Sequence, residues 1–132
     1  MAPEGIEVVR RSFAAWNAND WPALEAAYDP EVVVDPPEGW PEWEVAHGWE
    51  AVRSQFERLK EAWQDERVQV DEVEEVGDMV LAQFRWVAQG KASGVDVANA
   101  MWGLFTVRDA RIVRLKYFLN RSNAVAAAES PD

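Results

Sequence analysis

Cysteine is absent from this sequence, and histidine occurs only once, as His47. Without cysteine the chain can form no disulfide bond, thiolate nucleophile or cysteine-ligated zinc site, which is consistent with the cytoplasmic location that we expect. A single histidine cannot build a histidine-rich metal site, and the acidic run DEVEE is typical of the solvated part of a strand. We therefore expect no metal ion.

Basic side chains are also few, with 13 Lys and Arg against 24 Asp and Glu, which gives a net charge of −11. This negative field repels a phosphate backbone, so nucleic acid is not an expected partner. No apolar run approaches the ~20 residues of a membrane span, and the N-terminus has no secretory pattern, so we expect no membrane partner. Glycine-rich phosphate loops, nucleophile elbows and metal motifs are missing, which predicts a protein without a cofactor.

The sequence does contain enough apolar material for one folded domain over residues 1–132. Hydrophobic residues make up 48% of the chain and charged residues 28%, which is an ordinary globular balance. Tryptophan is frequent, with eight residues. Indoles combine a large apolar area with one N–H donor, so they suit both a packed core and the wall of an apolar ligand cavity.

The spacing of the apolar residues changes from a helical period in the first half to a period of two in the second. The expected elements are helices at 4–18, 21–28 and 48–65, strands at 31–35, 67–76, 79–89, 95–108 and 111–119, a loop at 36–47, and one further helical turn after residue 123. This order predicts an α+β fold in which three N-terminal helices cover one face of a curved antiparallel sheet.

Side-chain alternation divides the last three strands into two faces. The inward face is expected to hold Ala82, Phe84, Trp86, Val97, Asn99, Met101, Gly103, Phe105, Val113, Leu115, Tyr117 and Leu119. The strand at 95–108 is apolar on its other face too, where Trp102 and Leu104 lie. Three helices cover only one face, so we expect a homodimer through the outer face of the sheet.

Three stretches, VVRRSFAAWNANDWPALEAAYDPEVVVDP, HGWEAVRSQFERL and LFTVRDARIVRLKYFLNRSNAVAAA, resemble the nuclear transport factor 2-like superfamily. The most similar branch is the SnoaL-like polyketide cyclase and ketosteroid isomerase group, and the resemblance covers nearly the whole chain. It implies a cone-shaped, cystatin-like roll with a pocket at its wide end, often dimeric through the sheet. It also implies a hydrophobic small-molecule ligand and cofactor-free proton transfer, as in an isomerase or an aldol-type cyclase of the lyase type.

In the ketosteroid isomerase branch the acid that ends the first strand is the general base, and Asp35 in VVVDPP falls on that position. The alternative is that Asp-Pro simply ends a strand, with the carboxylate accepting hydrogen bonds from loop amides. The two oxyanion donors of that branch fall on Ser12 and Gly103. Neither can serve, because glycine has no side chain and serine is short, so steroid isomerisation of that kind is not expected.

Asn99 and Tyr117 are the polar residues expected to point inward from their strands. They either orient a ligand oxygen or bond each other, Asp35 or a buried water. His47 stands just before a helix and is either a general acid or base or a helix-entry residue in partial solvent. Asp35, Tyr117, Asn99 and His47 are therefore the candidate catalytic residues.

The ligand wall is expected from large apolar side chains on inward faces, although core packing is the alternative for most of them. These residues are Trp16, Phe56, Trp63, Phe84, Trp86, Met101, Leu115 and Leu119. Trp40 and Trp43 stand in the proline-rich loop, where they form a lid over the pocket or pack onto neighbouring helices or across a dimer.

The function stays open between two main readings. One is an apolar pocket for a hydrophobic, polycyclic or aromatic molecule, with Asp35 as base and Asn99 and Tyr117 holding a carbonyl oxygen. The other is a non-catalytic carrier or sensor of the same fold. A protein-interaction domain is a third, weaker reading.

Overall fold

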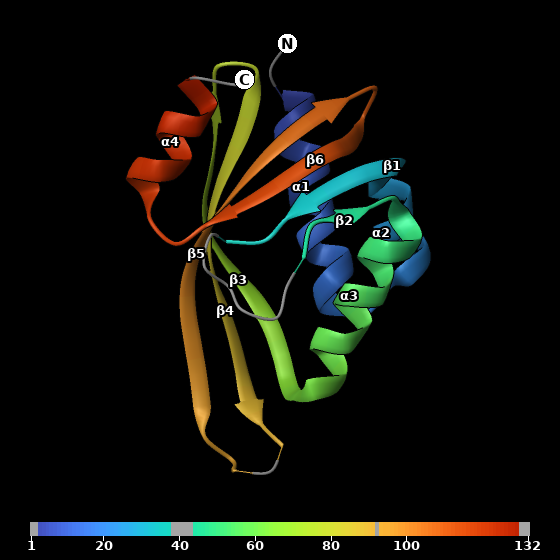
Figure 1. Ribbon diagram of the computed structural model, residues 1–132, viewed down its shortest axis with the longest axis vertical. Coiled ribbons are helices and arrows are strands. Elements are labelled where there is room, and N and C mark those ends of the chain that lie inside the picture. The colour runs from blue at the N-terminus through green and yellow to red at the C-terminus, as the bar shows by residue number, and fades with distance from the viewer. Residues whose placement is uncertain (1–2, 38–43, 92, 130–132) are drawn as a thin grey trace.

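The computed structural model describes residues 3–37, 44–91 and 93–129. Their helices and strands build an α+β fold in which a curved, open sheet wraps around three helices (Figure 1). A fourth helix packs against the opposite side of the sheet. The α+β class and the curved sheet expected from the sequence are therefore confirmed. No helix in the described ranges is long and apolar enough to cross a membrane.

Three helices occupy the concave side of the sheet, namely α1 (Pro3–Ala18), α2 (Trp21–Ala27) and α3 (Trp49–Ala62). Their apolar stripes form the core, in which Val8, Val9 and Val52 are completely buried. The Asp20 side chain caps α2 by accepting a hydrogen bond of 3.2 Å from the Ala23 N–H. The third helix is shorter than the expected 48–65, because the chain turns into a strand directly after Ala62.

The sheet has six strands in the order β2-β1-β6-β5-β4-β3. They are β1 (Tyr28–Asp35), β2 (Ala46–His47), β3 (Trp63–Val76), β4 (Met79–Gly90), β5 (Asp96–Arg108) and β6 (Arg111–Phe118). Strands β3 to β6 form the expected antiparallel meander, but β1 runs parallel to β6. The sheet is therefore mixed rather than purely antiparallel, since the crossover through α3 separates β1 from the meander.

Two register shifts change which side chains point inward. In β3 the pairing with β4 shifts between Gln64 and Arg67, where Asp65 has a φ of 52°. In β6, Arg114 pairs with Thr106 and Ile112 pairs with Val107, so Val113 is an extra residue. Such bulges re-aim side chains. The expected inward position of Val113 is therefore wrong, because Ile112 takes it and is completely buried.

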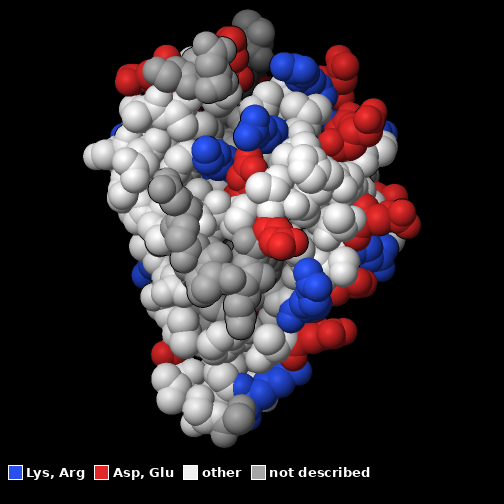
Figure 2. All heavy atoms as spheres, viewed as in Figure 1, with Lys and Arg blue, Asp and Glu red and all other residues white. Residues whose placement is uncertain are grey.

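The outer face of the sheet is partly covered by α4 (Arg121–Glu129), which packs Ala124 against Leu81 and Leu104. The sequence predicted only one helical turn here. The element is longer because Val125, Ala127 and Ala128 also pack against this second cluster. Figure 2 shows that charged side chains crowd the side of α2 and α3, whereas the side of β5 and α4 carries few of them.

Candidate functional site

A cavity of about 110 Å³ lies between the helices and the concave side of the sheet. Aromatic rings supply much of its wall and pack against one another, with centroid separations of 5.1 Å for Phe13–Phe84 and 6.2 Å for Phe84–Tyr117. The described residues that line it are Ser12, Phe13, Trp16, Leu24, Tyr28, Val34, Pro36, Pro37, Gln55, Phe56, Leu59, Val68, Phe84, Trp86, Asn99, Met101, Phe105, Leu115 and Tyr117. The cavity is therefore an apolar space with a few polar groups.

Two phenolic side chains line this cavity, Tyr28 from the start of β1 and Tyr117 from the end of β6. Burial raises the pKa of Tyr28 well above 10.0, the nearby Tyr117 raises it further, and a hydrogen bond with the Ser12 hydroxyl opposes the increase. Burial likewise raises the pKa of Tyr117 far above its ordinary value. Both phenols are therefore protonated at neutral pH and can donate a hydrogen bond, with Tyr28 exchanging Ser12 for a ligand oxygen.

Three further polar residues line the cavity. The Ser12 hydroxyl donates to the Val9 carbonyl at 2.6 Å, and the Gln55 amide donates to the Glu44 carbonyl at 2.7 Å. Asn99 is half-buried on β5, opposite Trp86 of β4. The Ser12 hydroxyl hydrogen is thus occupied by a backbone carbonyl, whereas Gln55 keeps a second N–H, so the donors that the described lining offers a ligand are this N–H, the phenols and the Asn99 amide.

Gly103 has no room for the donor that the ketosteroid isomerase branch carries at this position. A Cβ atom added there would lie 2.9 Å from a ring carbon of Phe105 and 3.3 Å from a methyl carbon of Leu115. The volume beside Gly103 is thus filled by rings and methyl groups. Steroid-type oxyanion stabilisation has no group at this position.

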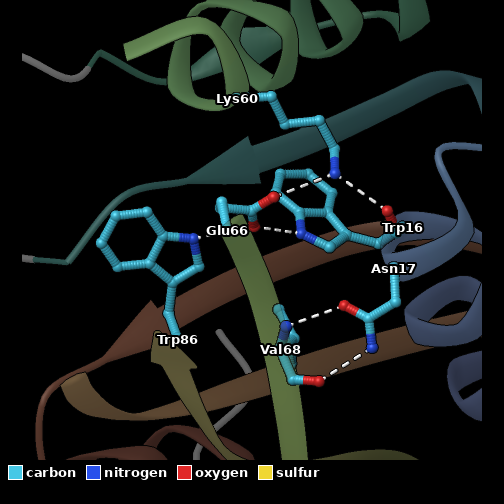
Figure 3. Close-up of polar contacts among 6 residues, drawn as sticks. All are labelled: Trp16, Asn17, Lys60, Glu66, Val68 and Trp86. Atoms are coloured by element: carbon cyan, nitrogen blue, oxygen red, sulfur yellow. Dashed lines mark hydrogen bonds and ion pairs between the residues drawn. The ribbon is translucent and has the colours of Figure 1, made fainter. Parts of the chain in front are cut away.

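A buried carboxylate, Glu66, fixes two indoles of the wall from behind. It accepts hydrogen bonds from the indole N–H of Trp16 and, at 2.9 Å, from that of Trp86 (Figure 3). Lys60 forms an ion pair with it at 3.0 Å, and the two side chains are only 12% and 4% exposed. The bulge in β3 turns Glu66 inward. Below it, the Asn17 amide exchanges two hydrogen bonds of 2.8 Å with the backbone of Val68.

Asp35 lies apart from this cavity. Val32 and Val34 of β1 are buried, so Asp35 falls on the opposite side of the strand. Its carboxylate accepts hydrogen bonds of 3.0 and 2.7 Å from the Nε and Nη2 atoms of Arg114 on β6. Asp35 is not among the described residues that line the cavity. The structure thus places the expected base outside the cavity in an ion pair in which Asp35 is 13% exposed and Arg114 is 56% exposed.

Some of the other candidate residues line the cavity, and others lie away from it. Asn99 and Tyr117 line the cavity, as do the apolar candidates Trp16, Phe56, Phe84, Trp86, Met101 and Leu115. Trp63 instead packs edge-on against Trp86, with centroids 5.3 Å apart, and Leu119 is 50% exposed beyond the end of β6. His47 is exposed on β2, away from this cavity and at an open surface groove. Trp40 and Trp43 lie outside the described residues.

Tyr28, Glu66 and Lys60 are among the residues of the site that sequence reasoning missed. Tyr28 was assigned to the end of a helix, although its position before an apolar run also fits the start of a strand. Glu66 stood outside the expected strand at 67–76, and nothing in its neighbours signals a bulge. Lys60 was not singled out, because its place in a helix does not show that it meets a buried carboxylate. The signal available in the sequence was that a basic residue, Lys60, and an acidic residue, Glu66, stand close to a tryptophan in the chain.

The raised pKa values of Tyr28 and Tyr117 predict that the stability of the protein depends on pH. Because their folded pKa values are raised above the unfolded ones, the stabilisation from the neutral phenols is fully present below pH 10.0 and is lost as the pH rises above that value. We expect the absorbance of tyrosinate to appear only together with unfolding in alkaline solution. Tyr28 and Tyr117 are the only tyrosines, so the signal has no other source. A tyrosinate signal with a midpoint near pH 10.0 in folded protein contradicts the prediction.

The solved structures similar to this chain share its fold. A putative SnoaL-like polyketide cyclase from Jannaschia sp. CCS1 is 23% identical, with a TM-score of 0.77, over 100% of this chain and 97% of that one. A putative polyketide cyclase from Sinorhizobium meliloti is 27% identical, with a TM-score of 0.68, over 84% and 93%. TerC, co-crystallised with polyporic acid, is 18% identical, with a TM-score of 0.78, over 96% and 98%.

Comparison with curated protein sequences gives no match. The family model of the SnoaL-like domain, by contrast, matches residues 9–115, which include α2, α3, strands β1 to β5 and most of α1 and β6. The matched region also holds every described residue of the cavity except Tyr117. The chain belongs to the SnoaL-like family, within the nuclear transport factor 2-like superfamily.

Proposed function

We propose that the protein binds a small hydrophobic molecule that carries an aromatic ring and a carbonyl or hydroxyl oxygen. The observation that carries this proposal is the pair of neutral phenols, Tyr28 and Tyr117, in an otherwise apolar wall. An apolar cavity with a few converging polar groups is the usual form of a small-molecule site. The Asn99 amide adds a further donor and an acceptor on the same wall.

The size of the cavity favours a ring-sized group. Its volume is about 110 Å³. An apolar protein cavity of roughly 150 Å³ accepts benzene, so a single aromatic ring is the scale of group that this one suits. The SnoaL-like family and the co-crystal of TerC with polyporic acid also support an organic small molecule.

Binding without catalysis is the function that the described residues support best. The described lining contains neither a carboxylate nor a histidine, so it offers no conventional base. Cofactor-free proton transfer, by an isomerase or an aldol-type cyclase, is the second candidate, because two similar structures are those of putative polyketide cyclases. In that case Tyr117 and Asn99 would hold a carbonyl oxygen as it gains charge, and Asp35 would act as base only after leaving Arg114 and turning to the inward side of β1.

A homodimer formed through the outer face of the sheet, in the cytoplasm, is part of the same proposal. Beyond the area covered by α4, this face presents the exposed side chains of Ala98 and Ala100, and Trp102 is half-buried beside them. Charged side chains also lie on this face, because Arg85 lies opposite Ala100 and pairs with Asp71 at 3.3 Å, and Lys116 lies opposite Leu104. A sheet face with an apolar centre and charged neighbours is suited to a second copy.

The proposed donors are tested with acetophenone and ethylbenzene, two ligands of similar size that differ in the carbonyl oxygen. We expect the wild-type protein to bind acetophenone more tightly, and Tyr28→Phe and Tyr117→Phe to reduce this preference by about three- to tenfold each, as for a lost hydrogen bond of about 1 kcal/mol. Titration calorimetry measures the affinities, and His47→Gln, a change at an exposed residue, is the control. Equal affinities of the wild-type protein for the two compounds would contradict the role of the phenols.

The role of Asp35 is tested with Asp35→Asn. Since its carboxylate is held by Arg114 and does not line the cavity, we expect unchanged acetophenone affinity. Arg114 is 56% exposed although Asp35 is 13% exposed, and asparagine keeps an oxygen acceptor for Arg114, so we also expect a loss of about 1 kcal/mol in the free energy of unfolding, measured with urea. For any compound that the wild-type protein turns over, a large loss of turnover with normal binding would establish the catalytic candidate instead.

The homodimer is tested by light scattering at micromolar concentration. We expect twice the 15.0 kDa mass of one chain. Trp102→Glu places a charge on the proposed interface and should yield the monomer, whereas Gln64→Glu, which adds the same charge at an exposed position, should not. A monomeric wild-type protein rules the homodimer out.

A further inference from the structure

The carboxylate of Glu66 serves two kinds of partner with separate oxygens. Its Oε1 atom accepts the N–H groups of both Trp16 and Trp86, whereas its Oε2 atom takes the ammonium group of Lys60 (Figure 3). The two indoles come from different elements, α1 and β4, and are 70 residues apart in the sequence. One oxygen atom therefore sets the position of one indole relative to the other.

Contacts behind the indoles complete their placement. The Lys60 ammonium lies 4.1 Å from the centre of the Trp16 ring and donates to the Trp16 carbonyl at 2.8 Å. Trp16 meets Phe56 edge-on, with centroids 4.8 Å apart, and Trp86 meets Trp63 in the same way at 5.3 Å. Both indoles are thus held at the N–H and against a neighbouring ring, Trp16 is also held through its backbone carbonyl, and both still line the cavity.

We propose that Glu66 is a positioning residue that makes the cavity select flat aromatic rings over puckered rings of the same size. It would act through Trp16 and Trp86, without touching the ligand itself, since Glu66 does not line the cavity. Aromatic rings gain most from one another at defined stacked or edge-on geometries, and an indole held in one orientation keeps such a geometry available. This inference rests on the proposed function, because it requires that the cavity bind a small molecule.

The Glu66–Lys60 pair is suited to this role rather than to simple stabilisation. A buried ion pair loses much of its attraction to the desolvation of both charges, and apolar residues of similar volume often replace it without loss of stability. The hydrogen bonds to the two indoles are directional, and apolar replacements cannot reproduce them. Removing the pair as a unit therefore removes the positioning bonds without leaving a buried charge, at a cost of about 1–3 kcal/mol for each indole N–H that loses its acceptor.

The test compares acetophenone with cyclohexyl methyl ketone, which carries the same carbonyl group on a puckered ring. Calorimetry measures both affinities for the wild-type protein, Glu66→Gln and the double variant Lys60→Met/Glu66→Leu. Glutamine keeps an Oε1 acceptor for the indoles but loses the charge that pairs with Lys60. The exposed pair Arg53 and Glu57, replaced as Arg53→Met/Glu57→Leu, is the matched control. Near-ultraviolet circular dichroism and urea unfolding establish that each variant is folded.

We expect the wild-type protein and the control to prefer acetophenone by about tenfold, which corresponds to one favourable aromatic contact. Glu66→Gln should be less stable and yet keep this preference to within about twofold, whereas the double variant should fold and lose it. A role in stability alone would lower both affinities of a variant equally and leave their ratio unchanged.

Three results would overturn the inference. They are an unchanged preference in the folded double variant, a lost preference in Glu66→Gln, and equal wild-type affinities for the two ketones. In the last case binding itself would remain, so the proposed function would stand. If the wild-type protein binds neither ketone, the proposed function fails, and this inference fails with it.

Discussion

The bond network of Glu66 is the interaction on which the cavity depends. It joins α1, α3, β3 and β4 at one point, through Trp16, Lys60 and Trp86. Two buried charges contribute little net stability, because desolvation offsets most of their attraction. Their directional bonds do fix where the helices stand relative to the sheet. The curved sheet and the helices can then enclose a space lined by rings without collapsing onto it.

The polar groups of the site therefore fall into two sets, one that holds the wall in place and one that can contact a ligand. Glu66 and Lys60 stand behind the wall and are saturated by each other and by the indoles. The phenols of Tyr28 and Tyr117 stand in the wall itself, where burial keeps them neutral. A neutral phenol can donate to a ligand oxygen, but it cannot take a proton from the ligand. The interior is therefore equipped to hold an oxygen atom and to orient a ring.

Much of the fold could be predicted from the sequence, because strand alternation in β4 and β5 fixed one face without ambiguity. Phe84, Trp86, Asn99 and Met101 were all expected to point inward, and all line the cavity. The prediction failed where regular alternation stops. The bulge that turns Glu66 inward and the extra residue at Val113 depend on strand pairing over long distances, which local spacing does not encode.

The side of β1 on which Asp35 lies could not be predicted from the sequence, for a different reason. Three consecutive valines fit the core in either phase, so the run in β1 does not say whether Val33 or its two neighbours point inward. Pairing with β6 decides this, since Val34 lies opposite Leu115, and Asp35 lies opposite Lys116. A shift of one residue would turn Asp35 inward but expose Val32 and Val34, which are 0% and 3% exposed. Because Val33 would then take an inward place, the net loss is one buried valine, worth about 1.5–3 kcal/mol. This exceeds what a pair with a 56% exposed arginine contributes, so valine packing, rather than Arg114, keeps the carboxylate outside.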